Sequence, residues 1–194
     1  FRVPVVELDA AVALLGRFPA LTGVDLRIGA GETVLLQGPN GAGKSTTLRI
    51  LYTVLKPDSG LATIDGFNVV EDPLGVRARI GTLPHGSGLY PHLTARENIA
   101  YYAKLYDMAS EAIDESVQNV IDQLNINDFA DRKTKGFSQG QRTKVSLARS
   151  LVHGPQNILL DRDDRPRITD FGLARPLEGA GGITETGAGM GSPS

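Results

Sequence analysis

A nine-residue run at positions 38–46 constrains this chain more than any other feature of its sequence. It has the form of a complete phosphate-binding loop, made of Gly38, Pro39, Asn40, Gly41, Ala42, Gly43, Lys44, Ser45 and Thr46. An apolar run precedes it and a predicted helix, 45–55, follows it, which is the strand–loop–helix context that such a loop requires. Its glycines let backbone N–H groups turn inward around a phosphate, at a helix N-terminus that favours anions.

Two side chains of this loop suit a metal–triphosphate complex. Lys44 is placed to reach the β- and γ-phosphates, and the hydroxyl of Ser45 is placed to bind Mg²⁺. A glycine-rich turn that merely caps a helix is the alternative interpretation. Because the motif is complete and lies in the required context, we predict that the chain binds a nucleoside triphosphate.

Composition narrows the class of protein further. The net charge of −2 gives no electrostatic reason to expect a nucleic-acid partner, and no cysteine is present for a disulfide or a thiolate metal site. No apolar stretch approaches the ~18–20 residues of a membrane span, and the N-terminus lacks the pattern of a signal peptide. We therefore expect a soluble protein that reaches a membrane only through a partner.

Hydrophobic periodicity predicts strands near both ends of the phosphate-binding region and helices in the middle of the chain. The predicted strands are 5–8, 12–15, 20–28, 33–37, 61–64, 79–83 and 157–160, of which 33–37 and 157–160 are expected to be buried. Capping boxes at Thr94–Glu97 and Ser138–Gln141 predict two helix starts, with an amphipathic helix over 113–124 between them. The order of elements indicates an α/β protein.

A second motif lies ahead of the last predicted strand. Residues 137–141 read Phe-Ser-Gln-Gly-Gln at a helix start, and strand 157–160 leads directly into Asp161. With the phosphate-binding loop, this pairing resembles the ATP-binding subunits of ABC transporters, whose signature loop reads Leu-Ser-Gly-Gly-Gln. The resemblance covers residues 5–161. It implies a P-loop NTPase fold of the ABC nucleotide-binding type over 1–161, with a helical subdomain at 86–155 and a truncation after the Walker B strand.

The resemblance also implies a role for each matched position. ATP and Mg²⁺ are the expected cofactors, with Ser45 and Asp161 as metal ligands. Two ATP-binding subunits would close head to tail, so that Ser138, Gly140 and Gln141 of one contact the ATP held by the other. A transmembrane permease subunit is the expected partner, which implies a cytoplasmic location at the inner face of the membrane. Residues 45–160 look most like the ATPases of sodium or drug export.

Two positions depart from the family's pattern. The loop that senses the γ-phosphate carries His85 where the family has Gln. An imidazole still makes one hydrogen bond there, so His85 is the candidate catalytic residue, with a structural surface histidine as the alternative. The adenine-stacking aromatic is replaced by Leu15, which leaves either an aliphatic surface or Phe18 to meet the base.

The family's pattern ends after Asp161. Arg162 stands where the family places its general base, and no histidine follows, so we expect hydrolysis to be impaired by roughly 10²–10⁴. Residues 162–194 instead resemble the Asp-Phe-Gly and activation segment of protein kinases, which implies a chimera joined within 157–161 and a largely disordered tail. A non-catalytic interaction fragment is the alternative. A kinase fragment is disfavoured because Val152 occupies the position of the catalytic Asp.

Overall fold

The computed structural model describes residues 3–83 and 88–160, and the chain divides into two compact units. Among the described residues, the first unit comprises residues 3–76 and the second comprises residues 77–83 and 88–160. His85, Asp161, and the tail predicted for 162–194 lie outside the described residues.

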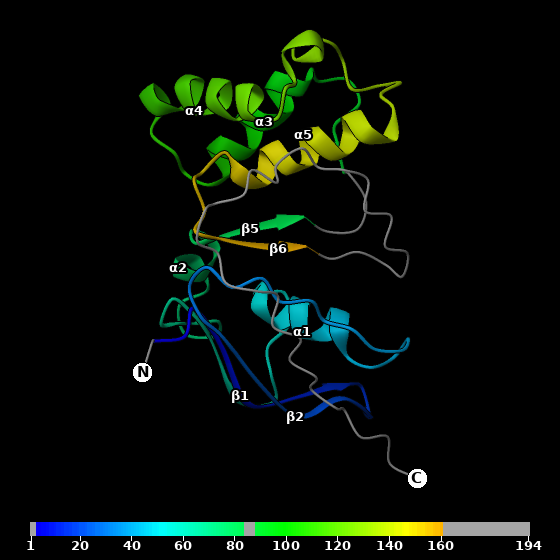
Figure 1. Cartoon of the computed structure of the whole chain (residues 1–194), viewed down its shortest axis with the longest axis vertical. Helices are drawn as coiled ribbons and strands as arrows, with labels where there is room; N and C mark the ends of the chain where they lie inside the picture. Colours follow the sequence, from blue (N-terminus) through cyan, green and yellow to red (C-terminus); the bar gives the residue numbers. More distant parts are fainter. Residues whose placement is uncertain (1–2, 84–87, 161–194) are drawn as a thin grey trace. The chain divides into compact units, whose positions relative to one another are not determined.

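The first unit is built on a four-stranded antiparallel sheet with the strand order β2-β1-β3-β4 (Figure 1). The strands are β1 (Val6–Leu15), β2 (Phe18–Ile28), β3 (Ser59–Ile64) and β4 (Phe67–Asn68). Helix α1 (Lys44–Leu51) packs on β2 and β3, and α2 (Pro73–Arg77) begins at the end of the unit. The sheet and α1 share one aliphatic core, which includes Leu8, Leu21, Ile50, Leu51 and Ile64.

The two strands predicted at 5–8 and 12–15 are joined in the structure as the single strand β1. The register of β1 against β2 shifts between Leu8 and Ala11, and the intervening Ala10 has a φ of 45°. Such a bulge breaks the alternation of inward and outward side chains while the strand continues. The sequence pattern therefore stops at the bulge although the hydrogen bonding does not.

The prediction of a buried strand at 33–37 is wrong for this structure, in which the segment forms no strand. Leu35 is 72% exposed, and its neighbours Val34 and Leu36 are only partly buried. An apolar run indicates burial, but it cannot supply the neighbouring strand that its N–H and C=O groups need. The sheet of the first unit is antiparallel, and none of its described strands pairs with this segment.

The second unit combines a parallel strand pair with three helices. Strands β5 (Ile80–Leu83) and β6 (Asn157–Leu160) pair in parallel. The helices are α3 (Ala95–Leu105), α4 (Ser110–Gln123) and α5 (Gln139–Leu151), with a short 3₁₀ turn, η1 (Asn127–Phe129). Helix α5 contacts β5 on one side and α3 and α4 on the other (Figure 1). Helices α3 and α5 confirm the two starts predicted from capping boxes, whereas α4 begins at Ser110, before the predicted 113–124. Strand β6 is less buried than predicted, because Ile158 and Leu160 are each 51% exposed.

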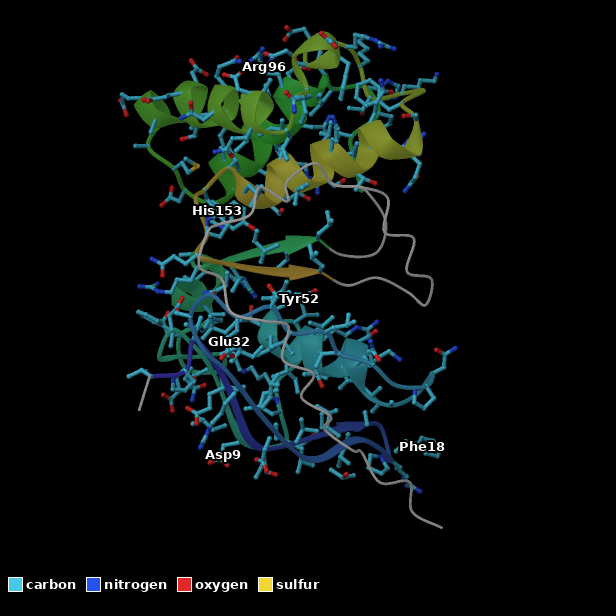
Figure 2. All side chains as sticks on the ribbon, viewed as in Figure 1. Asp9, Phe18, Glu32, Tyr52, Arg96 and His153 are labelled. Carbon is cyan, nitrogen blue, oxygen red and sulfur yellow. The ribbon has the colours of Figure 1, made fainter. Side chains whose placement is uncertain are left out.

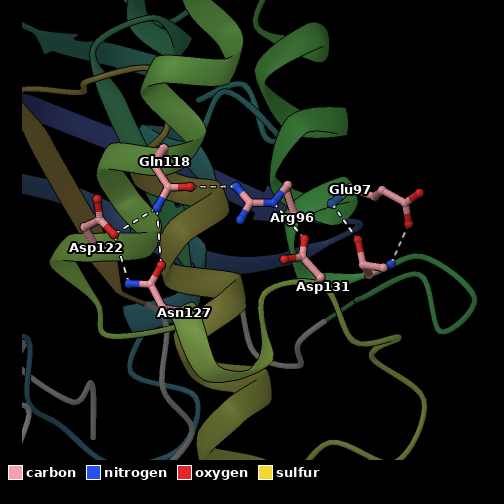
Figure 3. A network of polar contacts seen from close by, with 7 residues as sticks. Arg96, Glu97, Gln118, Asp122, Asn127 and Asp131 are labelled. Carbon is pink, nitrogen blue, oxygen red and sulfur yellow. Dashed lines mark hydrogen bonds and ion pairs between the residues drawn. The ribbon is translucent and has the colours of Figure 1, made fainter.

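A network of polar side chains connects α3, α4 and η1 (Figure 3). Arg96 donates to Asp131 Oδ1 and to Gln118 Oε1, each at 2.8 Å. Gln118 in turn donates to Asp122 Oδ1, which also accepts from Asn127, both at 2.9 Å. The hydrogen bond from Arg96 holds the pKa of Asp131 below its usual value. Because these groups are largely exposed, the network fixes the position of the η1 turn more than it stabilises the unit.

Candidate functional site

The loop at 38–43 turns the chain into α1 through backbone conformations that glycine favours. Gly41 and Gly43 have φ values of 85° and 84°, in the left-handed region. The backbone N–H of Ala42 donates to Pro39 O at 3.1 Å, which closes the loop. Gly43 is the N-cap of α1, and neither a capping side chain nor an acidic residue occupies the first turn. The helix therefore leaves N–H groups available to an anion.

Gly43 is held against the sheet as well as in the left-handed region. A Cβ atom at this position would lie 2.5 Å from Leu21 Cδ2 and 2.8 Å from Ala20 O, both on β2. At Gly41, a Cβ atom would meet no heavy atom within 4 Å. The close approach is therefore specific to Gly43, and it is the contact that seats the loop on β2.

The side chain of Lys44 folds back over the loop. Its Nζ donates to Gly38 O at 2.7 Å and to Pro39 O at 2.9 Å. An ammonium group carries three donors, so one remains for a phosphate oxygen. Of the two following residues, Thr46 is buried and Ser45 is partly buried. The loop thus combines N–H groups and one cation, which fits a polyphosphate.

Ser45 and Asp161 are the two predicted metal ligands. Ser45 is described, but Asp161 is not, so their pairing around Mg²⁺ stays a prediction. Residues 3–83 and 88–160 contain no group of three or more His, Cys, Asp or Glu side chains that could hold a metal ion. The Ser45 hydroxyl, at the start of α1, suits Mg²⁺ as one oxygen ligand, with the triphosphate oxygens as others.

The signature motif in the second unit begins α5 with both halves of the predicted capping box. Ser138 Oγ accepts from the N–H of Gln141 at 3.2 Å, and Gln141 Oε1 accepts from the N–H of Ser138 at 3.1 Å. Phe137 is buried and lies edge-on to Phe129, with ring centroids 5.4 Å apart. Ser138 and Gly140 are exposed on this anchored turn. The Ser138 hydroxyl still has its own proton to donate, whereas the Gln141 carbonyl oxygen is used within the cap.

Both sequence candidates for contact with a base lie at the turn between β1 and β2. Leu15 pairs with Phe18 at the end of the hairpin, and Gly16 between them has a φ of 68°. Phe18 is 79% exposed, and Figure 2 shows its side chain at the tip of the hairpin. Leu15 is also exposed. An aromatic and an aliphatic surface are therefore both available in the unit that carries the phosphate-binding loop.

Sequence reasoning missed a set of polar side chains inside the second unit, of which Asn98, Thr134 and Arg149 are buried and His153 is partly buried. The first three are 0%, 3% and 7% exposed. Burial lowers the pKa of Arg149 and the pKa of His153. A signal was present at Asn98, a polar residue between positions of the buried face of an amphipathic helix, Ala95 and Ile99. Thr134, Arg149 and His153 bind backbone groups 44 to 73 positions away, which no local motif marks. Asn98 instead binds the loop just before its own helix, 4 to 8 positions away.

Comparison with known proteins identifies the class. A family model described as "ABC transporter" matches residues 21–162, and the chain therefore belongs to the ABC transporter family. The chain is 41% identical over 143 residues to the ABC transporter ATP-binding protein NatA of Bacillus subtilis, covering 73% of this chain and 58% of that protein. It is 34% identical over 181 residues to a daunorubicin/doxorubicin resistance ATP-binding protein, DrrA, of Streptomyces peucetius, covering 91% of this chain and 55% of that one. The chain thus spans little more than half of either relative.

Solved structures agree with this assignment. The ATP-binding cassette MJ0796, solved as a dimer in a post-hydrolysis state bound to ADP and Pi, matches with a TM-score of 0.69 and 30% identity, over 81% of this chain and 73% of that one. The cbiO1 protein of Clostridium perfringens, part of the transporter complex cbiONQ, matches in fold with a TM-score of 0.73. The described elements therefore have the P-loop NTPase fold of ABC ATPases. Among these elements, no helix is long and apolar enough to cross a membrane.

Proposed function

We propose that this chain is the ATP-binding part of an export-type ABC transporter and that residues 38–46 bind the phosphates of Mg·ATP. The observation that carries the proposal is the loop geometry, in which a helix N-terminus without a side-chain cap meets the Lys44 ammonium. The names of the relatives, a daunorubicin/doxorubicin resistance protein among them, support the export class. Because the chain spans about half of those relatives, the activity of the whole protein belongs to the proposal.

Binding requires a small change at Lys44. The ammonium group is bonded to two carbonyl oxygens of its own loop, Gly38 O and Pro39 O. An incoming γ-phosphate would attract it more strongly than a neutral carbonyl does, because hydrogen bonds between charged partners are roughly twice as strong. The N–H groups at the start of α1 would hold the β-phosphate. Mg²⁺, when bound, would neutralise phosphate charge beside the Ser45 hydroxyl, with Asp161 as the second protein ligand.

The exposed turn at Ser138 and Gly140 supports a second half-site. We propose that it contacts the γ-phosphate of ATP bound to a partner subunit, in a head-to-tail dimer. The start of α5 offers the Ser138 hydroxyl and the positive end of the helix dipole, although its capping box already uses the N–H of Gln141, and its first turn contains no acidic residue. The relative solved as a dimer supports this arrangement. A transmembrane permease would be the further partner, with His85 in the segment that faces it and senses the γ-phosphate, at the cytoplasmic face of the membrane.

We further propose that hydrolysis is impaired. Arg162 directly follows the proposed metal ligand Asp161, and a guanidinium cannot accept a proton from an attacking water. A positioned general base contributes a factor of roughly 10²–10⁴, so turnover should fall by about that factor.

The origin of residues 162–194 is a separate question. A junction within 157–161 to a kinase-like segment stays a sequence-based hypothesis. The alignment with DrrA weighs against it, because an alignment covering 91% of this chain extends past residue 162 wherever it begins. A kinase origin of the preceding residues is opposed by Val152, which is buried at the end of α5 where a kinase would expose a catalytic carboxylate.

A non-catalytic interaction module is the second candidate function. The segment 33–37, which enters the phosphate-binding loop, pairs with no described strand of its unit and exposes Leu35. A loop without that support could lose its affinity for nucleotide. The two candidates therefore differ in one measurable quantity, the affinity for ATP.

Titration with a fluorescent ATP analogue in the presence of Mg²⁺ tests the proposal. Lys44→Ala should weaken binding by about tenfold or more, because a hydrogen bond to a charged group contributes ~1.5–3 kcal/mol. Lys56→Ala is the matched control, since it removes the same charge from an exposed position of the same unit. Equal affinities for the two variants and the unaltered chain would count against the assigned site. Lys44-dependent phosphate release as fast as that of an ABC ATPase that carries the general base would refute the impairment of hydrolysis.

A further inference from the structure

The hairpin that carries the candidate base contacts extends beyond the third strand of its sheet. Strand β1 pairs with β3 as far as Val12, which lies opposite Ser59. Residues 13–15 of β1 pair with β2 and, among the described strands, with no residue of β3. A two-stranded ribbon is marginally stable by itself, so the tip with Leu15 and Phe18 needs a further contact if it is to hold a base in one place.

Asp58, the residue before β3, supplies that contact. Its Oδ2 accepts from the backbone N–H of Leu14 at 2.7 Å. Its own N–H donates to Val12 O at 2.8 Å. Together the two bonds extend the contact between β1 and the chain before β3 as far as the residue that precedes Leu15. A carboxylate is the stronger kind of acceptor, because hydrogen bonds to a charged partner are roughly twice as strong as neutral ones.

The position of Asp58 is itself fixed by close packing at Gly60. Gly60 has a φ of 85°, and a Cβ atom there would clash with the carbonyl oxygens of Asp9 and Ala10 on β1. Ala10 is left-handed, with a φ of 45°, and the register of β1 against β3 shifts between Asp9 and Val12. Strand β3 therefore begins directly against the bulge in β1, which leaves Asp58 little freedom to slide along it.

The same hairpin is fixed to the phosphate-binding loop through its other strand. Gly43 lies so close to β2 that a Cβ atom there would be 2.8 Å from Ala20 O. Helix α1 follows Gly43, and residues 52–58 lead from the end of α1 to Asp58. Thus β2 is held by the loop before α1, and β1 is held by the chain after it. These two contacts set the distance between the hairpin tip and the phosphates.

We propose that Asp58 is a positioning residue for recognition of the nucleotide base. It touches neither base nor phosphate. Its carboxylate holds the tip of the hairpin so that Leu15 or Phe18 meets the base of a nucleotide whose phosphates lie in the loop at 38–46. The inference rests on the proposed ATP binding, and it adds that the preference for a nucleoside triphosphate over bare triphosphate depends on a carboxylate outside the loop.

Asp25 provides a matched control within the same hairpin. Its Oδ1 accepts from the N–H of Ala10 at 2.7 Å, the same length as the bond from Leu14 to Asp58. Both aspartates are exposed. The bond of Asp25 lies at the bulge, whereas the bond of Asp58 lies beside the tip. A loss confined to the Asp58 variants therefore reports the tip, and not the general effect of removing a carboxylate from this sheet.

Amide hydrogen exchange, measured by NMR without nucleotide, tests whether Asp58 anchors the tip. Asp58→Leu should speed exchange of the Leu14 N–H by about tenfold or more and leave the Ala10 N–H within about twofold. Asp25→Leu should do the reverse. Asp58→Asn keeps an acceptor oxygen and should retain most of the protection. Unchanged exchange at Leu14 in Asp58→Leu, or equal acceleration at Leu14 and Ala10, would overturn the proposal.

Calorimetric titration with ATP and with tripolyphosphate, each with Mg²⁺, tests the role in recognition. The unaltered chain should bind ATP more tightly, because the base adds a contact. Asp58→Leu should lower the affinity for ATP by about three- to tenfold and leave that for tripolyphosphate within about twofold, whereas Asp25→Leu should change neither beyond about twofold.

The outcomes of the titration separate this inference from the proposed function. A parallel loss of both ligands in Asp58→Leu would mean that Asp58 merely supports the loop. Equal affinities of the unaltered chain for ATP and tripolyphosphate would mean that the tip meets no base. Either result overturns the inference and leaves phosphate binding intact. Binding of neither ligand by the unaltered chain refutes the proposed function and base recognition with it, and hydrogen exchange still decides whether Asp58 anchors the tip.

Discussion

Replacement of Gly43 by alanine should weaken ATP binding more than the same replacement at Gly41. Both glycines have left-handed backbones, with φ values of 84° and 85°. An L-residue in this region costs ~1–2 kcal/mol, so both variants carry that cost. Only at residue 43 would the new Cβ also meet Leu21 Cδ2 at 2.5 Å and Ala20 O at 2.8 Å. Overpacking of this kind adds about 1–3 kcal/mol.

The total for Gly43→Ala is therefore about 2–5 kcal/mol, against about 1–2 kcal/mol for Gly41→Ala. To relieve the clash at residue 43, the first turn of α1 must shift away from β2. In the shifted position the N–H groups of this turn no longer point at the phosphates, so the extra cost of Gly43→Ala is also a loss of ATP affinity. Affinity then falls with the fraction of chains that keep the binding geometry, by about 5- to 150-fold relative to Gly41→Ala. Urea unfolding and titration with a fluorescent ATP analogue measure the two quantities on the same protein.

A double variant identifies the cause. In the background Leu21→Ala, the Cδ2 atom is gone, so Gly43→Ala should cost less there than in the unaltered chain. Relief should be partial, because Ala20 O remains. If Gly41→Ala weakens ATP binding as much as Gly43→Ala, or if Leu21→Ala leaves the cost of Gly43→Ala unchanged, the packing argument is refuted.

Three further outcomes follow from single residues. Leu35→Ala should change the free energy of unfolding by less than about 0.5 kcal/mol, because Leu35 is exposed. Leu8→Ala, in the core, should lower it by ~2–5 kcal/mol. Comparable losses for the two variants in urea unfolding would show that 33–37 is packed. Phe18→Ala should weaken binding of a fluorescent ATP analogue if its ring meets adenine, and an unchanged affinity would leave the aliphatic surface of Leu15 as the contact. Burial lowers the pKa of His153, so as pH falls the imidazole is protonated in the unfolded chain before it is protonated in the folded chain. The contribution of His153 to the free energy of unfolding is therefore complete above pH ~6.5 and declines below it, by at most about 1.4 kcal/mol per pH unit. His153→Phe should abolish that part of the pH dependence in urea unfolding between pH 7.5 and 5.5, and an unaltered slope would contradict it.

The features that sequence predicted well are those determined by neighbours within one turn. The capping boxes at Thr94 and Ser138 depend on a residue three positions later, and both form with both of their hydrogen bonds. The phosphate-binding loop depends on glycines and a lysine within nine residues, and it does precede a helix. Local rules suffice where the partners are local.

Most features that sequence missed depend on partners far along the chain. Thr134 and Tyr90 are 44 positions apart, so no spacing rule connects the hydroxyl with the carbonyl. Periodicity predicts a buried strand at 33–37 because it reports only that a segment prefers burial. Whether it has a neighbouring strand is a property of topology, and the antiparallel sheet of the first unit provides none.

The unpaired segment at 33–37 changes what Lys44 does for the loop. On one side the loop is fixed by Gly43 against β2, whereas on the other it continues into a segment without backbone partners in the sheet. The bonds from Lys44 Nζ to Gly38 O and Pro39 O close the loop at that weaker side. A nucleotide that draws the ammonium towards its γ-phosphate removes this closure and must replace it with its own contacts to the loop N–H groups. The affinity for ATP therefore depends on the free-energy difference between the loop closed by Lys44 and the loop closed by nucleotide. A Lys44 variant loses affinity for two reasons, because it lacks a phosphate contact and because ATP must then order an open loop.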